Sequence, residues 1–372
     1  MRPAADMGRA APRRILHVFS TFKVGGPQVR FAALAAGLGR DFEHVVIAMD
    51  GQYAARDHLV PDAPVAFADA PEASGLLGRL SAYRREIARR APTLLVTYNW
   101  GAIEWSLANI GSGTPHVHIA DGFGPEEAER QLPRRVWFRR IALQGSRVIA
   151  PSLKLRDLAV KTWSVAPDRV LYVPNGIAPC DDFSTQLQDL LPDLAAGRPR
   201  IVWAGAMRGE KNLPRLIRAF APLRDEATLV LIGDGPEREA VEREIGVQGL
   251  APHVRLVGQR QDVRDLVMQC DLMAVSSDTE QMPLAVLEAM DAGLPVASTD
   301  VGDVRSMVAP ENRAFVIDAD DAKLTAAMRE LVADKALRAR LGEANRRRAR
   351  TEYSLEGMCG SYRAIFTECQ TR

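Results

Sequence analysis

The chain has 372 residues, more than one ordinary hydrophobic core supports, and this length predicts two domains of typical size. Its content of 47% hydrophobic and 26% charged residues indicates a folded protein and excludes a disordered one. The formal net charge of +1 gives no basis for nucleic-acid binding, so we expect no nucleic-acid partner.

The N-terminal residues and the cysteines bear on where the protein works. Residues 1–14 contain arginines and alanines without the apolar run of a secretory signal, and no apolar run in the chain approaches the roughly 20 residues that span a bilayer. The 4 cysteines are far apart and form no C-x-x-C pair, which predicts neither a zinc site nor a disulfide framework. We therefore expect a cytoplasmic protein, or one attached peripherally to the inner face of the membrane.

Short apolar runs alternate with helical stretches along the whole chain. In the first half these runs are 15–20, 45–49, 94–98, 116–120, 148–151 and 170–173. In the second half they are 201–204, 229–232, 254–257, 272–276, 296–299 and 314–317. Continuous apolar runs are typical of parallel strands that helices cover on both faces. The sequence therefore predicts an α/β fold with two doubly wound parallel sheets.

The chain divides into two domains, a linker and a final helix. A polar, irregular stretch rich in proline separates the two series of strands, and the last stretch is helical and charged. A run of arginines in that last stretch, Arg346, Arg347, Arg348 and Arg350, favours a solvated helix face. The predicted segments are an N-terminal domain 1–177, a linker 178–200, a C-terminal domain 201–350 and a helix 351–372.

One segment of the second domain carries most of the chemistry. Residues 276–290 follow an apolar strand and open a helix. Pro283 suits the first helical position, because its missing N–H is one that the helix could not use. The free N–H groups of Leu284, Ala285 and Val286 then form an anion site at the positive end of the helix dipole.

Two glutamates flank this anion site. Glu280 lies on the loop in front of it, and Glu288 lies roughly 7–8 Å along the helix from Pro283 at 1.5 Å per residue. Gly293 and Pro295 end the helix after about three turns. Phosphates at the N–H groups, with hydroxyls at each glutamate, match the layout of a nucleoside diphosphate sugar. Local capping by Glu288 and an ordinary loop position for Glu280 are the alternative, and the pair in this context favours the ligand site.

These residues resemble the signature of the retaining glycosyltransferases of family 4, which have the GT-B fold. The resemblance rests on the spacing of Glu280 and Glu288 and continues through 289–296 and Val301-Gly302. It extends along most of the chain, because further motifs of the family follow in the right order. These are Gly25-Gly26, the turn 173–177, the loop 205–212, the turn 233–236 and Val257-Gly258.

The resemblance implies two Rossmann-like domains that face each other across a cleft, with the acceptor in the first and the donor in the second. The final helix crosses back to brace the first domain. The implied reaction moves a sugar, with retention, from a UDP- or GDP-sugar to a hydroxyl of a saccharide or lipid-linked acceptor. The implied role is the assembly of a cell-surface polysaccharide or a glycolipid, without a metal or another cofactor.

The resemblance also assigns roles on the donor side. Glu288 would hold the ribose hydroxyls, and Glu280 would hold the donor sugar. Arg208 and Lys211 would neutralise the leaving diphosphate, the role that a metal plays elsewhere. The backbone around Met282, Pro283, Leu284 and Ala285 would bind the diphosphate. The base would lie near Gly258 and Arg260.

The sequence departs from the family at two places. Ala206 stands where members commonly carry arginine, and we expect Arg208 to supply that charge instead. Asp121 stands where many members have a histidine beside the reacting sugar. We expect Asp121 to bind a donor or acceptor hydroxyl, although an aspartate before Gly122 also suits an ordinary turn.

Two glycine pairs are candidates for nucleotide-binding loops. Gly25-Gly26, between a strand and a helix, favours a loop that faces phosphate or acceptor, and a turn with positive φ is the alternative. Neither this pair nor Gly233-x-Gly235 completes G-x-G-x-x-G, since Arg238 fills the third place. A nicotinamide-dependent dehydrogenase is therefore disfavoured.

Two charged regions lie outside the donor site. The stretch from Arg134 to Arg140 mixes basic and aromatic residues, which favours a solvated helix with Trp137 or Phe138 in the core. Contact with anionic lipid or with a lipid diphosphate acceptor is the alternative. The acidic residues of the linker and of the segment after the last strand are interpreted as structural, and no metal is expected there. They are Asp181, Asp182, Asp318, Asp320 and Asp321.

Two other functions remain open from the residues. One is a nucleotide-sugar epimerase of related fold, which would turn over without an acceptor. The other is a catalytically weak nucleotide-sugar-binding protein, which Ala206 and Asp121 motivate.

Overall fold

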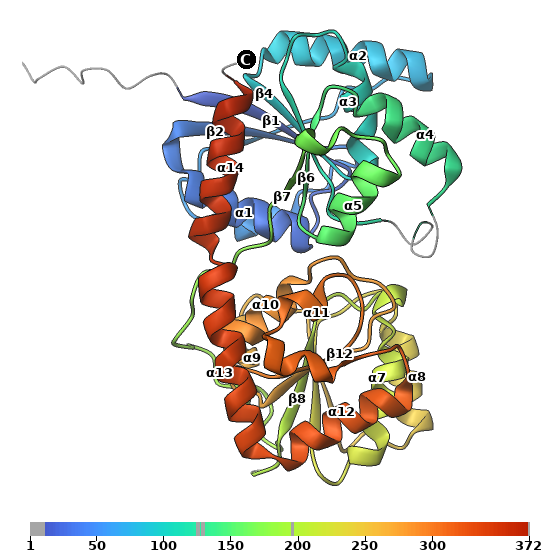
Figure 1. Ribbon diagram of the computed structural model, residues 1–372, viewed down its shortest axis with the longest axis vertical. Coiled ribbons are helices and arrows are strands. Elements are labelled where there is room, and N and C mark those ends of the chain that lie inside the picture. The colour runs from blue at the N-terminus through green and yellow to red at the C-terminus, as the bar shows by residue number, and fades with distance from the viewer. Residues whose placement is uncertain (1–11, 124–126, 128–130, 195–196, 371–372) are drawn as a thin grey trace, which may run out of the picture.

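The structure, a computed structural model, describes residues 12–123, 127, 131–194 and 197–370. The chain forms two lobes that lie one above the other along the long axis of the molecule (Figure 1). Each lobe is built on one parallel sheet, with seven strands in the first lobe and six in the second. The predicted α/β fold with two doubly wound sheets is confirmed.

The first sheet has the strand order β3-β2-β1-β4-β5-β6-β7, and all of its pairings are parallel. Its strands are β1 (Arg13–Phe19), β2 (Phe42–Ala48), β3 (Val65–Ala68), β4 (Leu94–Tyr98), β5 (His116–Ile119), β6 (Arg147–Ala150) and β7 (Val170–Tyr172). Its helices are α1 (Gly26–Leu38), α2 (Gly75–Arg90), α3 (Ile103–Ala108), α4 (Pro133–Ala142) and α5 (Leu153–Lys161).

The second sheet has the order β10-β9-β8-β11-β12-β13, again with parallel pairings. Its strands are β8 (Arg200–Ala204), β9 (Thr228–Ile232), β10 (Val254–Gly258), β11 (Leu272–Val275), β12 (Val296–Thr299) and β13 (Val316–Ile317). The helices of the C-terminal half of the sequence are α6 (Leu187–Leu190), α7 (Leu213–Phe220), α8 (Arg238–Val247), α9 (Val263–Val267), α10 (Leu284–Asp291), α11 (Val304–Met307), α12 (Asp321–Ala333), α13 (Lys335–Glu352) and α14 (Leu355–Cys369), of which α14 lies on the first lobe.

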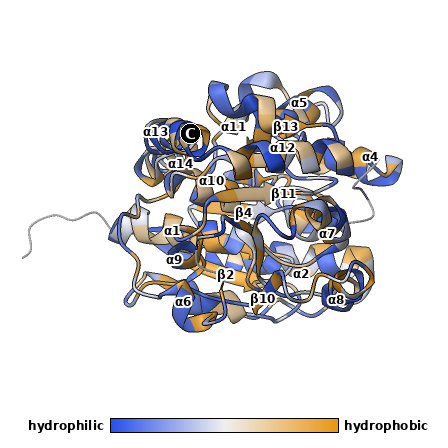
Figure 2. Cartoon of the chain, turned by 90° about the horizontal axis from the view of Figure 1, so that it is seen from below, coloured by the Kyte–Doolittle hydropathy of each residue, from blue (hydrophilic) through white to orange (hydrophobic). Residues whose placement is uncertain are grey.

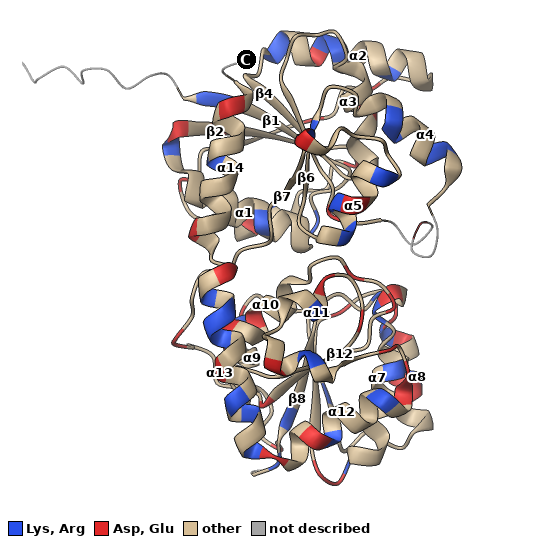
Figure 3. Ribbon diagram, viewed as in Figure 1, with Lys and Arg blue, Asp and Glu red and all other residues tan. Residues whose placement is uncertain are grey.

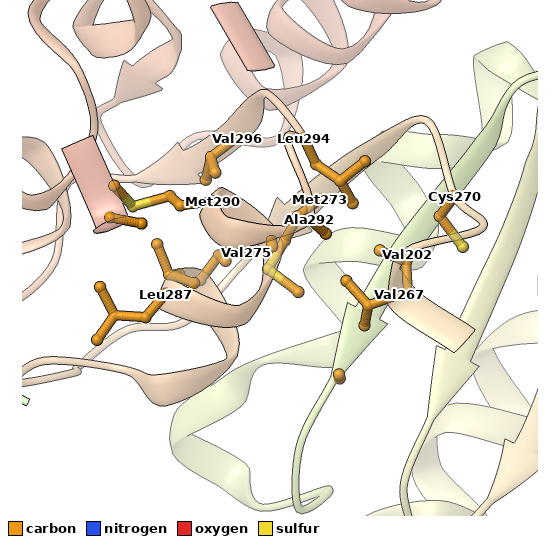
Figure 4. Close-up of a cluster of buried hydrophobic side chains, with 14 of the residues drawn as sticks. Val202, Val267, Cys270, Met273, Val275, Leu287, Met290, Ala292, Leu294 and Val296 are labelled. Atoms are coloured by element: carbon orange, nitrogen blue, oxygen red, sulfur yellow. The ribbon is translucent and has the colours of Figure 1, made fainter. Parts of the chain in front are cut away.

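The strands are apolar because both faces of each sheet are covered. Figure 2 shows hydrophobic residues concentrated on the strands inside the molecule, with hydrophilic residues on the outer faces of the helices. On one face of the second sheet, Leu287 and Met290 of α10 pack with Met273 and Val275 of β11 (Figure 4). This buried contact fixes α10 on the sheet, and with it the start of the helix.

The sequence missed one strand and misplaced another. The edge strand β3 contains Ala66 and Phe67, which are exposed, so it does not form the fully buried apolar run that marks an inner strand. The run 314–317 yields only the two-residue strand β13, because a 3₁₀ helix (Pro310–Phe315) occupies its first half.

Two long helices close the chain. α13 runs along the second lobe and α14 along the first, where α14 packs on α1 (Figure 1). Arg346 and Arg348 of α13 donate to backbone carbonyls, including that of Asp291 at the end of α10, and Arg350 binds the Asp291 carboxylate at 2.8 Å. The predicted solvated face is therefore wrong for these three arginines: Arg346 and Arg350 support the C-terminal end of α10, and Arg348 donates to carbonyls at the end of α11.

Candidate active site

The helix α10 begins directly after the loop that follows β11. Pro283 is its N-cap, with ψ of 123°, and not its first helical residue as predicted. The carbonyl of Pro283 accepts the N–H of Val286 at 3.2 Å, so the prediction that this N–H is free is wrong. Within the described residues, the N–H groups of Leu284 and Ala285 have no acceptor, which leaves two donors at the positive helix end. The helix has 8 residues and is shorter than the predicted three turns.

Lys211 and Glu280, two predicted site residues, form an ion pair. The Lys211 Nζ donates to Glu280 Oε1 at 2.6 Å, and Ser277 Oγ donates to the same oxygen at 2.8 Å. Both side chains are mostly shielded, with exposed fractions of 22% for Lys211 and 11% for Glu280. The N–H of Asp278 donates to the carbonyl of Glu210 at 2.8 Å and fastens the two loops together. The folded chain thus places the predicted cation against the predicted sugar-binding carboxylate.

Glu288 stands in a different environment from Glu280. It is half-buried on α10, and no described residue donates a hydrogen bond to its carboxylate. Burial raises the pKa of Glu288 to about 7, and the charge of Arg264 opposes this shift only in part, since Arg264 itself binds Asp291 at 2.8 Å. A carboxylate that has lost water without gaining donors is suited to accept hydroxyl groups of a ligand.

The loops after β8 and β9 approach each other so closely that only glycine fits. A Cβ on Gly233 would lie 1.8 Å from the carbonyl oxygen of Gly205, and one on Gly235 would lie 2.4 Å from that of Met207. Backbone therefore lines this part of the site. Arg208 lies on the loop after β8, and its exposed side chain has no partner in the part of the chain described. Its role beside Lys211 stays a prediction.

The predicted base-binding end lies at the carboxyl end of β10. Gly258 has φ of +79°, a conformation that favours glycine, and its carbonyl accepts the N–H of Gly233 at 2.8 Å. Arg260 binds both oxygens of Asp262, at 2.8 and 2.6 Å, and holds the pKa of that carboxyl well below its usual range. The guanidinium of Arg260 is thus fixed by its neighbour.

The glycine pair of the first lobe faces the start of α10. Gly25 is the N-cap of α1 with extended backbone, and neither Gly25 nor Gly26 has a positive φ, so the turn interpretation is wrong. A Cβ on Gly26 would lie 3.9 Å from Cδ1 of Leu284. The N-termini of α1 and α10 therefore meet where the two lobes come together.

Asp121 is engaged in a buried ion pair that the sequence did not reveal. The guanidinium of Arg30, on α1, donates to both of its carboxylate oxygens, at 2.5 and 2.9 Å. Arg30 also donates to Asn175 Oδ1 at 3.1 Å, and Asn175 Nδ2 donates to the carbonyl of Met282 at 2.8 Å. This chain of hydrogen bonds links the first lobe to the backbone just before α10. The predicted binding of a hydroxyl by Asp121 stays a prediction, which would use the remaining lone pairs of its oxygens.

A second set of contacts joins the lobes at the start of α5. Asp303, after β12, accepts the N–H of Leu153 at 2.6 Å and so caps a helix of the other lobe. Burial raises the pKa of Asp303. Ser152 Oγ donates to Gln281 Oε1 at 3.1 Å. These contacts hold the loop of Glu280 against the first lobe.

Three of the residues that organise the site were missing from the candidates. They are Arg30, Asn175 and Asp303. A signal for Arg30 was present, because it is a lone charge in the apolar stretch 29–35 of a helix, which requires a buried partner. Asn175 and Asp303 lie in or beside family-like motifs, yet each has a partner on the other lobe that leaves no local signal in the sequence.

The basic segment from Arg134 to Arg140 falls on α4 and splits into two groups. Arg139 is buried and binds both oxygens of Glu127, at 2.9 and 2.7 Å, while Arg135 reaches the same carboxylate at 3.1 Å. The side chain of Trp137 is 62% exposed, so it is Phe138, packed edge-on against Trp100 at 5.6 Å, that faces inward. Only part of the segment therefore faces solvent.

Four of the five acidic residues interpreted as structural have a local partner or capping role, and the fifth, Asp182, is exposed. Asp181 binds Arg350 at 2.6 Å, Asp318 binds Lys323 and Asp321 binds Arg218. Asp320 caps α12 through the N–H of Lys323. In the described ranges no group of three or more His, Cys, Asp or Glu could hold a metal ion. No helix of the same ranges is long and apolar enough to cross a membrane.

Both halves of the chain match known protein families. Residues 192–348 match the family described as glycosyl transferases group 1, and residues 25–176 match the glycosyl transferase 4-like domain. The two matches do not overlap and together cover most of the chain.

Individual proteins agree with these matches over long stretches. The alpha-maltose-1-phosphate synthase of Mycolicibacterium smegmatis is 28% identical over 296 residues, 71% of this chain and 76% of that protein. The GDP-mannose-dependent alpha-mannosyltransferase of the same organism is 25% identical over 366 residues, 95% of this chain and 81% of that protein. The structure of Anabaena HepE in complex with UDP and glucose has a TM-score of 0.82 at 18% identity, covering 96% of this chain and 100% of that one. This last likeness shows the GT-B fold.

Proposed function

This chain belongs to the group 1 glycosyltransferases of family 4, and we propose that it moves a sugar from a nucleoside diphosphate sugar to an acceptor hydroxyl with retention of configuration. The observation that carries the donor proposal is the arrangement around α10. The two free N–H groups, Glu280 and Glu288 all lie within residues 280–288, and Lys211 pairs with Glu280, while Glu288 accepts no hydrogen bond from the described residues. The N–H groups match the diphosphate, the Lys211–Glu280 pair matches the donor sugar, and Glu288 matches the ribose.

We assign each group a task in transfer. Glu288 accepts hydrogen bonds from the ribose hydroxyls, and Glu280 from a hydroxyl of the donor sugar. The diphosphate lies at the backbone of Met282, Pro283, Leu284 and Ala285. The base lies near Gly258 and Arg260. A UDP- or GDP-sugar contains the base, ribose, diphosphate and sugar that these positions would bind, and the structure of Anabaena HepE is a complex with UDP and glucose.

The reaction depends on positioning and on charge. The bond between the anomeric carbon and the diphosphate breaks, and Lys211, Arg208 and the N-terminus of α10 stabilise the negative charge that develops on the leaving oxygen. The acceptor hydroxyl then attacks from the face that the diphosphate leaves, and its proton passes to a diphosphate oxygen. Holding both substrates in this geometry supplies a large part of the acceleration. Because two cations and a helix end carry the charge, we propose that transfer needs no metal.

The surface of α4 supports a peripheral contact with the inner face of a membrane. Trp137 and Ile141 are exposed, with fractions of 62% and 37%, and Arg134 and Arg140 are exposed on the same helix. Apolar side chains beside cations suit an anionic lipid surface. Such a location would serve the assembly of a cell-surface polysaccharide or glycolipid. Arg139 takes no part, because it is buried on Glu127.

The test begins with a thermal-shift screen of nucleotide sugars, since a ligand that binds only the folded state raises its stability. The donor that binds best is then offered to a set of saccharide and lipid-linked acceptors, and the anomeric configuration of the product is read by NMR. We expect a retained configuration. Turnover of the donor sugar without any acceptor would support an epimerase, and binding without transfer would support a binding protein.

A further inference from the structure

Asp303 stands at the start of α11, but its side chain serves a helix of the other lobe. It is the N-cap residue of α11, and within the described chain its carboxylate accepts no N–H group of that helix. Instead Oδ2 accepts the N–H of Leu153 at 2.6 Å and Oδ1 that of Lys154 at 3.5 Å, at the start of α5. The two helices face each other where the lobes meet (Figure 1), and Asp303 is 4% exposed. We call this contact the interlobe cap.

The interlobe cap completes the first turn of α5. The first N–H groups of a helix have no acceptor within the helix, and a carboxylate there also suits the positive end of the helix dipole. Ser152 Oγ accepts the N–H of Leu155 at 3.1 Å, and Asp303 accepts the two N–H groups before it. Figure 3 shows basic residues on α5, and the charges of Lys154 and Arg156 oppose the rise in the pKa of Asp303 that burial causes. The first lobe therefore supplies both hydrogen bonds and positive charge to this carboxylate.

The loop of Glu280 rests on the backbone of the same segment. The N–H of Asp303 donates to the carbonyl of Gln281 at 2.8 Å. Gly302 has φ of +53°, and a Cβ on it would lie 2.4 Å from the carbonyl oxygen of Gln281 and 2.6 Å from that of Glu280. Only glycine permits so close an approach in this conformation. A displacement of Asp303 is therefore transmitted directly to the backbone of Glu280.

Gln281 carries the same loop to the first lobe through its side chain. Its Oε1 accepts the hydroxyl of Ser152 at 3.1 Å, and a Cβ on Gly122 would lie 3.5 Å from its Cγ. The neighbouring Glu280 is fixed within its own lobe by the ion pair with Lys211 at 2.6 Å. The loop is thus held from two sides, by a pair inside the second lobe and by contacts with the first lobe.

We propose that Asp303 is a positioning residue for transfer, which acts through the loop of Glu280 by capping α5 of the first lobe. The inference rests on the proposed function, in which Glu280 binds the donor sugar, and adds the residue that fixes Glu280 relative to the first lobe. A misplacement of about 1 Å in a reacting geometry can lower a rate by about 10²-fold. Loss of the interlobe cap therefore acts on turnover and spares nucleotide binding, whose proposed contacts lie within the second lobe.

The kinetic test uses the full chain with the donor and acceptor that the nucleotide-sugar screen identifies. Asp303→Ala should lower kcat at least about tenfold and leave the Kd of free UDP and GDP within about twofold. Asp303→Asn keeps one oxygen for the N–H of Leu153 and should lose less. Asp320→Ala is the matched control, because it removes an aspartate that caps α12 within the second lobe, and it should leave kcat unchanged. Equal kcat for Asp303→Ala and Asp320→Ala, or no advantage of Asp303→Asn over Asp303→Ala, would overturn the proposal.

Hydrogen exchange of the same variants gives a readout that does not depend on activity. Peptides that span 152–157 and 276–282 should exchange about tenfold faster in Asp303→Ala, because both segments lose a contact that holds them, and neither should change in Asp320→Ala. Strand β9, in the core of the second lobe, should keep its exchange rate and so show that the variant is folded. Faster exchange at 152–157 with unchanged exchange at 276–282 would show that the cap does not hold the loop, and would overturn the proposal.

A double variant tests whether Asp303 acts through Glu280 and separates this proposal from the proposed function. Added to Glu280→Gln, the change Asp303→Ala should lower kcat by less than about threefold, because the loop no longer carries the carboxylate that it positions. The full loss repeated in that background would overturn the proposal. Normal turnover in Glu280→Gln alone would refute the role of Glu280 in the proposed function. Reduced turnover in Glu280→Gln with normal turnover in Asp303→Ala would refute the positioning role alone.

Discussion

The two lobes build their halves of the site in different ways. In the second lobe, Glu280, Glu288 and the start of α10 come from one continuous stretch of chain, with Lys211 added by a neighbouring loop. In the first lobe, the pair of Arg30 and Asp121 joins residues 91 positions apart, and both side chains are buried. The donor side is therefore local and partly open for a ligand, whereas the first lobe rests on long-range pairs that are already satisfied.

The largest expected effect concerns the buried pair of the first lobe. Arg30→Met leaves the Asp121 carboxylate buried without its partner, and this should lower the free energy of unfolding by about 3–5 kcal/mol. Urea denaturation measures it. The matched control is Arg79→Met, which removes the more exposed pair with Glu104 and should cost no more than about 1 kcal/mol. Similar, small losses for the two variants would mean that the buried pair does not set the stability of this lobe.

The next effect concerns the cations of the donor side. Lys211→Ala should reduce turnover by about 10²–10³, because it removes one stabilising group from the leaving diphosphate, and Arg208→Ala should do the same if Arg208 replaces the arginine absent at Ala206. KM should change less than kcat. Arg218→Ala, which removes an outward ion pair with Asp321, is the control and should leave turnover unchanged. A near-normal rate for Arg208→Ala would leave Lys211 as the sole assigned cation.

The features that could be predicted from the sequence are the local ones, and those that could not are the long-range pairs. The order of strands along the chain, the two sheets and the residues around α10 could be predicted, because apolar periodicity, a proline near a helix start and paired glutamates are local features. The predicted start of α10 was wrong by one residue, since Pro283 is the N-cap and not the first helical residue. The partners Arg30 and Asp303 could not be assigned, because each pair depends on how distant segments fold together. Edge strand β3 was missed although its four residues are all apolar; two of them, Ala66 and Phe67, are exposed at the edge of the sheet.

The pH dependence of nucleotide binding should follow Glu288. In the free protein burial raises its pKa from 4.5 to about 7, and ribose hydroxyls that donate to the carboxylate favour the ionised form. Affinity for a nucleoside diphosphate should therefore rise with pH up to about 7–8, by at most about tenfold per unit below the pKa. Calorimetric titrations at pH 6, 7 and 8 measure this slope. In Glu288→Gln the part of the slope that belongs to Glu288 should vanish, and an unchanged slope would assign the proton elsewhere.

The raised pKa of Glu288 also predicts how the stability of the protein changes with pH. Because the folded-state pKa of Glu288 is raised, its protonated form is favoured in the folded protein, and ionisation between about pH 4.5 and 7 lowers the stability. Glu288→Gln should remove this loss. Thermal unfolding should then show the variant more stable than the parent at pH 8 and little different at pH 4.

Removal of metal ions should have the smallest effect, because we expect it to leave transfer unchanged. Since Lys211, Arg208 and the helix end carry the diphosphate charge in the proposed mechanism, transfer should persist in excess EDTA. Complete loss of activity that added Mg²⁺ or Mn²⁺ restores would contradict the metal-independent mechanism.

The most direct test of the donor assignment is a comparison of its two glutamates. Free UDP and GDP are titrated into the unmodified protein, Glu288→Ala and Glu280→Gln, and turnover of the donor sugar is measured on the same samples. We predict that Glu288→Ala weakens the better nucleotide at least about tenfold, since each hydrogen bond to a charged group contributes about 1.5–3 kcal/mol. Glu280→Gln should leave nucleotide affinity within about twofold and still reduce turnover. Indistinguishable nucleotide affinities for the two variants would contradict the division of ribose and sugar between Glu288 and Glu280.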